Sequence, residues 1–281
     1  MSWTKRHNWG IGQKSSLLNF RELSAWLKDH GISPVIEQGI KLEGFQCAED
    51  SEVAQSCELL LALGGDGTML RSVHLMGQQQ KPILGINLGS LGFLTETSQD
   101  QMWQSLEQVA RGQYQIEERA IIKGKTEGQE FFALNDFDIR VPTRLVELSV
   151  SVGGEFLSRY YADGMLISTP TGSTAYSLSA GGPIVEPTME VMVITPICPH
   201  TLSIRPMIVP MDKTVEVTVH GKREEAIMVV DGQQRLSFKA GQQIVFEKAG
   251  IKAKLVKTQK SSFYNILRTK LKWGARGEDG K

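Results

Sequence analysis

Asp66 is the residue whose type and surroundings best suit chemistry in this chain. It stands in the run Gly64-Gly65-Asp66-Gly67-Thr68, directly after the five apolar residues 59–63. Glycines in a turn let the backbone take positive φ and let a ligand approach with no Cβ in the way. A carboxylate in such a turn would repel a phosphate unless it accepts a proton or holds a cation. The structural alternative is that Asp-Gly is a common turn pair and that Asp66 caps the following helix.

The elements around Asp66 predict an anion site. The apolar run 59–63 indicates a buried strand of the parallel type. Apolar residues at 69, 70, 73 and 76 have helical spacing and predict a helix over 68–76. A strand, a glycine turn and a helix N-terminus together place N–H groups and a positive dipole end at one spot, which suits phosphate.

A second dense motif covers 163–183. A predicted strand over 165–168 runs into a continuous series of small, mostly hydroxyl-bearing residues and then a short helical turn. The hydroxyls and N–H groups could bind a polyhydroxylated ligand, and Tyr176 could supply an aromatic wall. The alternative is that a run rich in Ser, Thr and Gly is merely a loop.

The order of elements predicts two domains. Helices alternate with buried strands through about residue 100, which favours a parallel α/β sheet whose ligands bind beyond the carboxyl ends of the strands. The expected strands are 34–37, 59–63 and 82–87, and the expected helices begin at Ser15 or Ser16 and at 99. Residues 39–57 are expected to form a loop or short helical piece. Residues 1–14 are a poor candidate for the usual opening strand, since Trp9-Gly10-Ile11-Gly12 is no hydrophobic run.

From Tyr114 to about Thr258 the pattern changes to short β-type runs separated by turn pairs, which predicts a mostly β, sandwich-like domain. The predicted domains are 1–112, 113–260 and a C-terminal segment, 261–281, that packs back on the body and ends in a frayed tail after Gly274. The expected strands of the second domain are 120–123, 131–134, 148–152, 165–168, 191–195, 215–220, 227–230, 244–246 and 253–256.

Composition limits the partners and the compartment. In the 281 residues, Lys plus Arg number 31 and Asp plus Glu also 31, so no net charge draws the chain to nucleic acid or to an anionic membrane. No apolar run approaches the length of a membrane span, and the N-terminus is not a secretory signal. Cys47, Cys57 and Cys198 form no pair spacing and are expected to be buried, reduced thiols. These features predict a cytoplasmic protein without nucleic-acid or membrane partners.

Taken together, these motifs resemble the NAD kinase family over most of the chain. The family's Gly-Gly-Asp-Gly-Thr is present at 64–68, its Leu-Gly segment corresponds to 85–94, and its Asn-Glu pair is Asn135-Asp136 here. The long Asp-Gly to Ser-Leu-Ser block is intact at 163–179, and 199–203, 231–233 and 271–274 also look like the family. Gly-Gly-Asp-Gly alone is weak, whereas the 163–183 block beside it is specific.

The resemblance implies an enzyme that phosphorylates the adenosine-ribose 2′-hydroxyl of NAD with ATP, or in some members with polyphosphate. It further implies an α/β N-terminal domain, a β-sandwich-like C-terminal domain, a site between them, and a homodimer or homotetramer. Phosphoryl transfer needs positioning, charge neutralisation and a group that takes the hydroxyl proton, and Asp66 is the candidate. Mg²⁺ or another divalent cation would offset the repulsion of the acid, held largely by phosphate oxygens, so no protein metal ligand is expected.

Carried over residue by residue, the resemblance implies binding roles for a set of side chains. The donor phosphates would meet Gly67 and Arg71, and Arg144 is placed to meet a phosphate. Asn135, Asp136 and Asp163 would hydrogen-bond the dinucleotide, and Gln233 would contact substrate. The expected pocket wall is Thr174, Ala175, Tyr176, Ser177, Leu178 and Ser179.

Three features depart from the family pattern. Asp136 replaces the commoner glutamate, and Tyr161 stands where relatives often carry a basic residue. The weak opening strand departs most. A separate pattern concerns five lysines near the C-terminal end, which alternate with apolar residues and are interpreted as the solvent-facing side of a strand. They are Lys248, Lys252, Lys254, Lys257 and Lys260.

Two other functions share part of the pattern. A lipid or diacylglycerol kinase has a similar glycine turn, but it needs an apolar slot where 163–183 offers hydroxyls. A non-catalytic dinucleotide sensor would not need Asp66.

Overall fold

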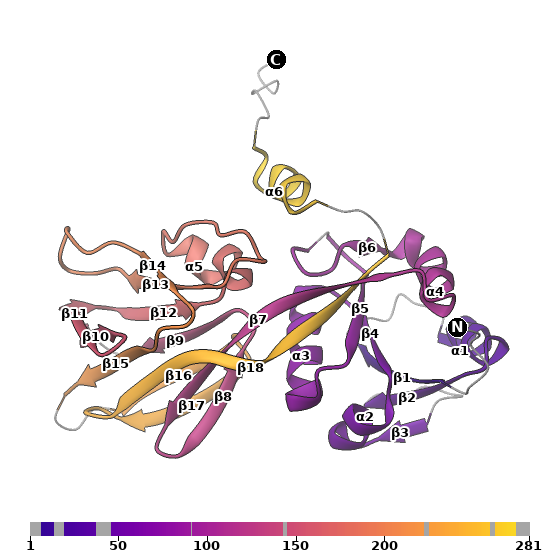
Figure 1. Cartoon of the computed structure of the whole chain (residues 1–281), viewed down its shortest axis with the longest axis horizontal. Coiled ribbons are helices and arrows are strands. Elements are labelled where there is room, and N and C mark those ends of the chain that lie inside the picture. Colours follow the sequence, from indigo (N-terminus) through magenta and orange to yellow (C-terminus); the bar gives the residue numbers. More distant parts are fainter. Residues whose placement is uncertain are drawn as a thin grey trace. The chain divides into compact units, whose positions relative to one another are not determined.

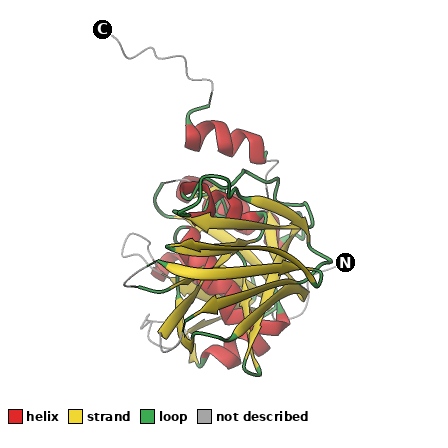
Figure 2. Cartoon of the chain, turned by 90° about the vertical axis from the view of Figure 1, so that its left-hand side faces the viewer, coloured by secondary structure: helices red, strands yellow, loops and turns green. Residues whose placement is uncertain are grey.

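The computed structural model describes residues 7–13, 20–37, 46–90, 92–142, 145–221, 225–258 and 262–273. The chain divides into two compact units, one of residues 1–118 and 253–281 and the other of residues 119–252. Both boundaries fall inside long strands, β7 (Gln115–Thr126) and β18 (Gln243–Lys257) (Figure 1). Strands make up much of the chain, as Figure 2 shows.

The first unit is built on a parallel sheet in which neighbouring strands run in the order β3-β2-β1-β4-β5. The short strand β6 and the end of β18 both pair in parallel with β5. The strands are β1 (His7–Gln13), β2 (Ile32–Glu37), β3 (Gln46–Ala48), β4 (Leu59–Leu63), β5 (Pro82–Asn87) and β6 (Thr97–Ser98). The strand order reverses direction between β1 and β4, and in doubly wound sheets this switch point is where ligands bind.

Helices cover both faces of this sheet. Leu23 and Leu27 of one helix and Leu106 of another share a core with Leu59, Leu61 and Leu63, while Met69 packs against Gly85. Because strand side chains alternate between faces, α3 lies on the opposite face from α1 and α4. The helices are α1 (Phe20–Asp29), α2 (Asp50–Ser56), α3 (Asp66–Met76), α4 (Met102–Ala110) and α6 (Phe263–Leu271), with 3-10 turns η1 (Gly77–Gln79) and η2 (Gln99–Gln101).

The second unit holds two antiparallel layers. One contains the neighbours β11-β10-β15-β18 and the hairpin β7-β8, and the other has the order β14-β13-β12-β9-β16-β17. Its strands and helical turns are β8 (Gln129–Ala133), β9 (Asp136–Arg140), β10 (Val146–Val152), β11 (Glu155–Ala162), β12 (Gly164–Ser168), η3 (Thr171–Thr174), α5 (Tyr176–Ser179), β13 (Val191–Ile197), β14 (Met207–Pro210), β15 (Val215–His220), β16 (Glu225–Val230) and β17 (Gln234–Lys239). A large shared core joins the layers, with the rings of Phe137 and Phe246 5.0 Å apart.

The predicted fold class, an α/β domain followed by a sandwich-like β domain, is confirmed. The expectation for the opening strand is wrong, because β1 forms and pairs with β2 on one side and β4 on the other. Residues 39–57 include β3 and α2, and the two strands expected at 244–246 and 253–256 are the single strand β18. The sequence also missed β9, β11, β14 and β17.

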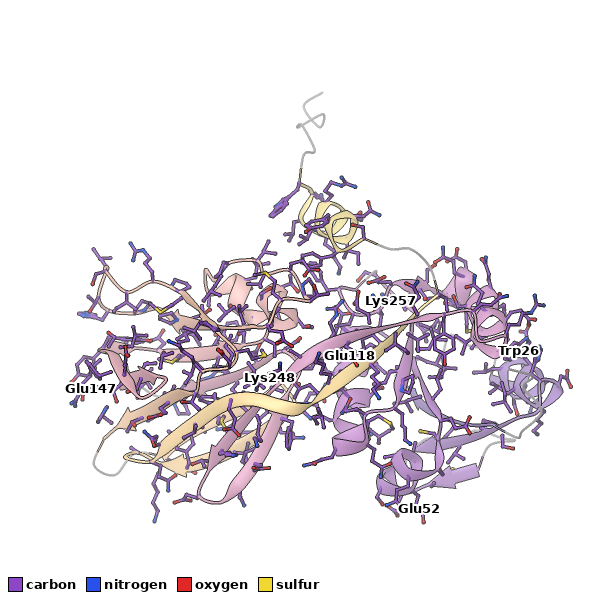
Figure 3. The ribbon with its side chains drawn as sticks, viewed as in Figure 1. Trp26, Glu52, Glu118, Glu147, Lys248 and Lys257 are labelled. Carbon is purple, nitrogen blue, oxygen red and sulfur yellow. The ribbon has the colours of Figure 1, made fainter. Side chains whose placement is uncertain are left out.

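Several single-residue expectations also change. Cys57 is buried as expected, but Cys47 and Cys198 are exposed. On α1, the ring of Trp26 (Figure 3) stacks on His30 at 3.9 Å, and His30 Nε2 lies 3.2 Å from Glu107 Oε2.

No helix among the described residues is both long and apolar enough to span a membrane.

Candidate functional site

Asp66 lies where the switch point of the parallel sheet predicts a ligand. It is the first residue of α3, directly after β4 and the turn Gly64-Gly65. Its carboxylate does not cap its own helix, so the capping alternative is wrong. It accepts hydrogen bonds from the N–H groups of Phe93 at 2.8 Å, Leu94 at 3.0 Å and Thr95 at 3.2 Å, and from Thr95 Oγ1 at 3.2 Å. The loop after β5 therefore fixes the carboxylate of Asp66.

The two carboxylate oxygens of Asp66 are used unequally. Oδ1 accepts the three bonds from Leu94 and Thr95, whereas Oδ2 accepts only the bond from Phe93 among the residues that the structure describes. A carboxylate offers about four lone-pair positions, two on each oxygen. The bonds found therefore leave Oδ2 able to accept one further donor, and the residue is only half-buried.

The glycines around Asp66 have two different reasons to be glycine. A Cβ at Gly64 would overlap the Thr68 hydroxyl, and one at Gly92 would overlap the Asp66 carboxylate. At Gly65 and Gly67 a Cβ would meet nothing within 4 Å, and of the turn's three glycines only Gly64 has a positive φ. Gly64 and Gly92 are required by packing, whereas Gly65 and Gly67 have room for further atoms where a Cβ would stand.

Two arginines were predicted to meet phosphates. Arg71 lies on α3 and its side chain is exposed. Arg144 lies outside the described residues.

One side of β9, in the six-stranded layer of the second unit, carries three charged side chains. On β9 the apolar Phe137 and Ile139 enter the core, so Asp136, Asp138 and Arg140 share the opposite face. Asp136 and Asp138 are buried, with 5% and 4% of their surface exposed. Asp138 forms an ion pair with Arg140. A buried carboxylate without enough partners is costly, which is typical of a site that binds something.

Burial changes the acidity of both carboxyls. The pKa of Asp136 is raised from 3.8 to about 7, first by burial and then by the negative charges of Asp231 and Asp138. The pKa of Asp138 is raised by burial against the opposing effect of Arg140. Ser168 of β12 is paired with Asp136 of β9, and its buried hydroxyl has no hydrogen-bond partner in the described part of the chain. The start of β9 and the adjoining end of β12 thus have unused hydrogen-bonding capacity.

Asp231 holds the Asn135-Asp136 pair in place. Its buried carboxylate accepts bonds from the N–H groups of Leu134 at 2.9 Å, Asn135 at 2.7 Å and Asp136 at 3.0 Å. On the other side, the Thr169 N–H donates to the Asn135 carbonyl at 2.8 Å. The sequence predicted a role for Gln233, which is exposed, but missed this role of Asp231 two residues earlier.

The 163–183 motif folds against the same backbone. A Cβ at Gly172 would overlap the carbonyl of Asn135, so this glycine is required by close packing. The hydroxyl of Ser177 is buried and bonded to Thr195 Oγ1 at 2.8 Å, so it attaches α5 to β13. Of the other residues of the predicted wall, Thr174, Ala175 and Leu178 are half-buried, whereas Tyr176 and Ser179 are exposed.

Asp163 is one of the residues that line an open cavity. The cavity has a volume of about 500 Å³, and its lining includes Arg140, Arg235, Leu145 and Ile227. Sequence reasoning missed Arg140 and Arg235. The alternation in Asp136-Phe137-Asp138-Ile139-Arg140 was the signal that could have placed Arg140 on the same side of β9 as the two aspartates.

Both units match domains of small-molecule kinases. Residues 13–114 match the ATP-NAD kinase N-terminal domain, and residues 137–258 match the ATP-NAD kinase C-terminal domain. The NAD kinase of Geotalea daltonii is 40% identical over 267 residues, which cover 91% of this chain and 93% of that protein. The chain therefore belongs to the ATP-NAD kinase family.

Solved structures share the fold. The crystal structure of yeast NADH kinase complexed with NADH has a TM-score of 0.89 at 24% identity, over 99% of this chain and 91% of that one. An NAD kinase from Archaeoglobus fulgidus in complex with ATP has a TM-score of 0.77 at 25% identity, over 95% and 98% of the two chains.

Proposed function

We propose that this chain transfers the terminal phosphoryl group of ATP to the 2′-hydroxyl of the adenosine ribose of NAD, giving NADP and ADP. Membership of the ATP-NAD kinase family supports phosphorylation of NAD in general. The observation that carries the mechanism is the carboxylate of Asp66, which is fixed by four donors and retains an open acceptor position on Oδ2.

Asp66 serves as the base. A ribose hydroxyl is a poor nucleophile at neutral pH, so a carboxylate within hydrogen-bond reach assists as the new bond forms. The 2′-oxygen bonds to the γ-phosphorus, the bond from that phosphorus to the bridging oxygen of ADP breaks, and the hydroxyl proton passes to Oδ2. The three backbone donors hold the carboxylate still, and in phosphoryl transfer positioning supplies much of the rate.

The donor phosphates bind in the space beside Gly65 and Gly67. The room above these glycines and the N-terminus of the 11-residue helix α3 support this assignment. Among the described residues, no three His, Cys, Asp or Glu side chains gather as a cation site. In this proposal the divalent cation, Mg²⁺ or a similar ion, is held largely by the ATP phosphates and arrives as MgATP.

NAD binds beside the charged side of β9. The buried Asp136 and the immobilised Asn135 supply acceptors and donors for ribose hydroxyls and amides, and Asp163 opens to a cavity of about 500 Å³. These polar groups favour a dinucleotide over a lipid, whose acyl chain needs an apolar slot. Thr174, Ala175, Tyr176, Leu178 and Ser179 form the wall of this site, with Gln233 and the two arginines, Arg71 and Arg144, as further contacts.

The protein works in the cytoplasm as a homodimer or homotetramer. The edge strand β14 supports self-association, because Met207 and Ile208 on it are 41% and 46% exposed. Exposed apolar side chains on an edge strand are typical of an interface.

The test is an activity assay with the acceptor varied. Purified protein is incubated with ATP, Mg²⁺ and either NAD or diacylglycerol, and the products are separated by chromatography. We expect NADP from NAD and no phosphorylated lipid. Product from the lipid alone would indicate a lipid kinase, and NAD binding without product would indicate a sensor; either result contradicts the proposal.

A further inference from the structure

We propose that Lys257 is a positioning residue for the carboxylate of Asp66 and that it acts through Glu96. The inference rests on the proposed role of Asp66 as the base. Lys257 lies near the end of β18, far along the chain from the glycine turn, and the sequence pattern predicted that it faces solvent. That prediction is wrong, because its side chain is only 14% exposed.

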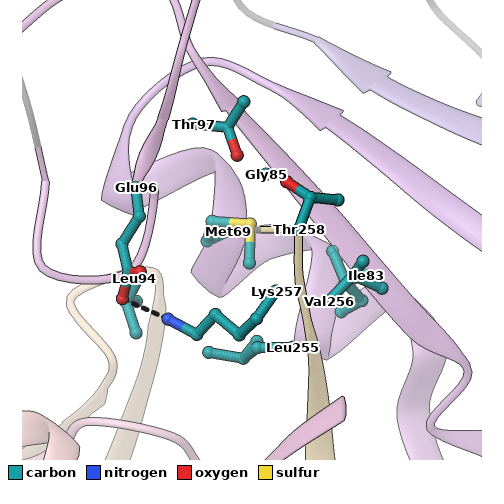
Figure 4. A pocket seen from close by; sticks show the side chains of 10 residues that line it. All are labelled: Met69, Ile83, Gly85, Leu94, Glu96, Thr97, Leu255, Val256, Lys257 and Thr258. Carbon is teal, nitrogen blue, oxygen red and sulfur yellow. Dashed lines mark hydrogen bonds and ion pairs between the residues drawn. The ribbon is translucent and has the colours of Figure 1, made fainter. Parts of the chain in front are cut away.

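Lys257 forms an ion pair with Glu96, whose side chain is 13% exposed. Figure 4 shows the two side chains pointing toward each other, with Lys257 Nζ at the Glu96 carboxylate. Glu117 on β7 adds a second acid, with its Oε1 3.5 Å from Lys257 Nζ. Because Lys257 and Glu96 are largely removed from water, removal of either partner leaves a poorly solvated charge and costs more than the loss of one partner of an exposed pair.

Glu96 directly follows the residues that hold Asp66. The N–H groups of Phe93, Leu94 and Thr95 all donate to the Asp66 carboxylate, and so does the Thr95 hydroxyl. Asn87, at the end of β5, donates from Nδ2 to Thr95 Oγ1 at 2.9 Å. The loop is therefore attached to β5 at Thr95 and to β18 at Glu96, and the second attachment depends on Lys257.

The cavity beside this ion pair is too small to be the reason for it. Its volume is about 20 Å³, and its lining includes Met69, Leu94, Glu96 and Lys257. A space of this size holds about one water molecule, not a nucleotide. An effect of Lys257 on the reaction therefore has to pass through the loop and Asp66, and not through direct contact with a substrate in this cavity.

The experiment compares variants that break the ion pair with one that keeps it. Lys257→Met and Glu96→Gln each remove one charge, and the double variant removes both. Lys257→Arg keeps the pair. Lys254→Met is the matched control, because Lys254 lies on the same strand and an odd number of residues away, on the opposite face. For each variant we measure kcat, KM for NAD, thermal stability and amide hydrogen exchange of the peptide that covers 92–97.

We expect Lys257→Met and Glu96→Gln to lower kcat by roughly 10- to 100-fold with little change in KM for NAD, as misplacement of a catalytic group does. The double variant should lose no more than the worse single variant, because both residues act through one interaction. Exchange of the 92–97 amides should be roughly tenfold faster in these variants and unchanged in Lys254→Met. Lys257→Arg should recover most of the activity.

Three outcomes would overturn the inference while leaving the proposed function intact. These are a kcat within twofold of wild type in Lys257→Met, losses in the double variant that multiply, or unchanged exchange of the 92–97 amides. A wild-type protein that makes no NADP contradicts the proposed function instead. In that case the exchange measurement still decides whether Lys257 orders the loop.

Discussion

The carboxylate of Asp231 accepts a hydrogen bond of 2.7 Å from the backbone N–H of Asn135, a residue 96 positions away in the chain. Two further bonds, from Leu134 and Asp136, complete the arrangement. Bonds from N–H groups to an ionised acceptor are about twice as strong as neutral ones. Asp231 thus acts on the proposed NAD site by fixing the backbone of the residues that carry the binding side chains.

Replacing Asp231 by Ala should weaken NAD binding more than turnover. The substitution removes the acceptor of three N–H groups, of which those of Leu134 and Asp136 are buried, and each buried group left unpaired costs about 1–3 kcal/mol. We expect a lower melting temperature and a KM for NAD that rises about tenfold or more, equivalent to about 1.4 kcal/mol. Asp212→Asn, at an exposed turn, is the control and should change neither quantity. An unchanged KM for NAD in Asp231→Ala would contradict this role.

Much of the fold follows from the sequence, because hydrophobic periodicity and glycine turns report local structure directly. The run 59–63 and the helical spacing after it predicted β4 and α3 correctly. Strand β1 could not be predicted in the same way. Glycine has low strand propensity, and β1 forms because β2 and β4 supply hydrogen bonds on both sides.

The candidate site, like the fold, could be predicted from the sequence only where a local pattern exists. Asp66 could be singled out, because an acid among glycines is a local pattern. Its partners could not be, since Phe93, Leu94 and Thr95 are 27 to 29 residues away and donate through their backbones, which leaves no trace in residue type. Lys257 was misread because alternation identifies a face of a strand but does not show what covers that face.

Asp66→Asn should abolish most turnover and keep NAD binding. An amide has almost the same shape, so its oxygen can still accept the bonds from Leu94 and Thr95. Its NH₂ group cannot accept the ribose proton, and it would face the Phe93 N–H, which is also a donor. We expect kcat to fall on the order of 100-fold or more, the usual contribution of a general base. Titration calorimetry with NAD should give an affinity within a few-fold of wild type. Turnover near the wild-type rate would exclude Asp66 as the base.

The raised pKa of Asp136 should make stability depend on pH. The folded protein holds this proton up to about pH 7, whereas the unfolded chain releases it near 3.8. Between these values the folded state binds more protons, so the free energy of unfolding falls as pH rises from about 4 to about 7 and then levels off. One such group contributes a slope of at most about 1.4 kcal/mol per pH unit.

Urea unfolding measured across this pH range checks the slope, with Asp136→Asn as the comparison. The variant cannot ionise at this position, so its slope should be smaller, with the raised pKa of Asp138 accounting for part of what remains. Equal slopes in the two proteins would mean that Asp136 is already ionised well below neutral pH.

Substitution of two glycines of the turn by Ala should distinguish a role in packing from a role in ligand binding. Ala in place of Gly67 would put its Cβ into open space, so the fold should tolerate it and even gain up to about 1 kcal/mol of helix propensity. The same methyl group would occupy the surface proposed for the donor phosphates, so KM for ATP should rise by roughly tenfold, about 1.4 kcal/mol. Steady-state kinetics with varied ATP and a thermal melt measure both effects.

Gly64→Ala is the matched variant for this prediction. Here the Cβ would overlap the Thr68 hydroxyl at a position with φ of 157°, so the main effect should be a loss of stability of about 1–3 kcal/mol. The two substitutions are chemically identical and lie three residues apart, so only the space around each explains a difference. If Gly67→Ala destabilises the protein as Gly64→Ala does and leaves KM for ATP unchanged, the open surface at Gly67 does not bind the donor.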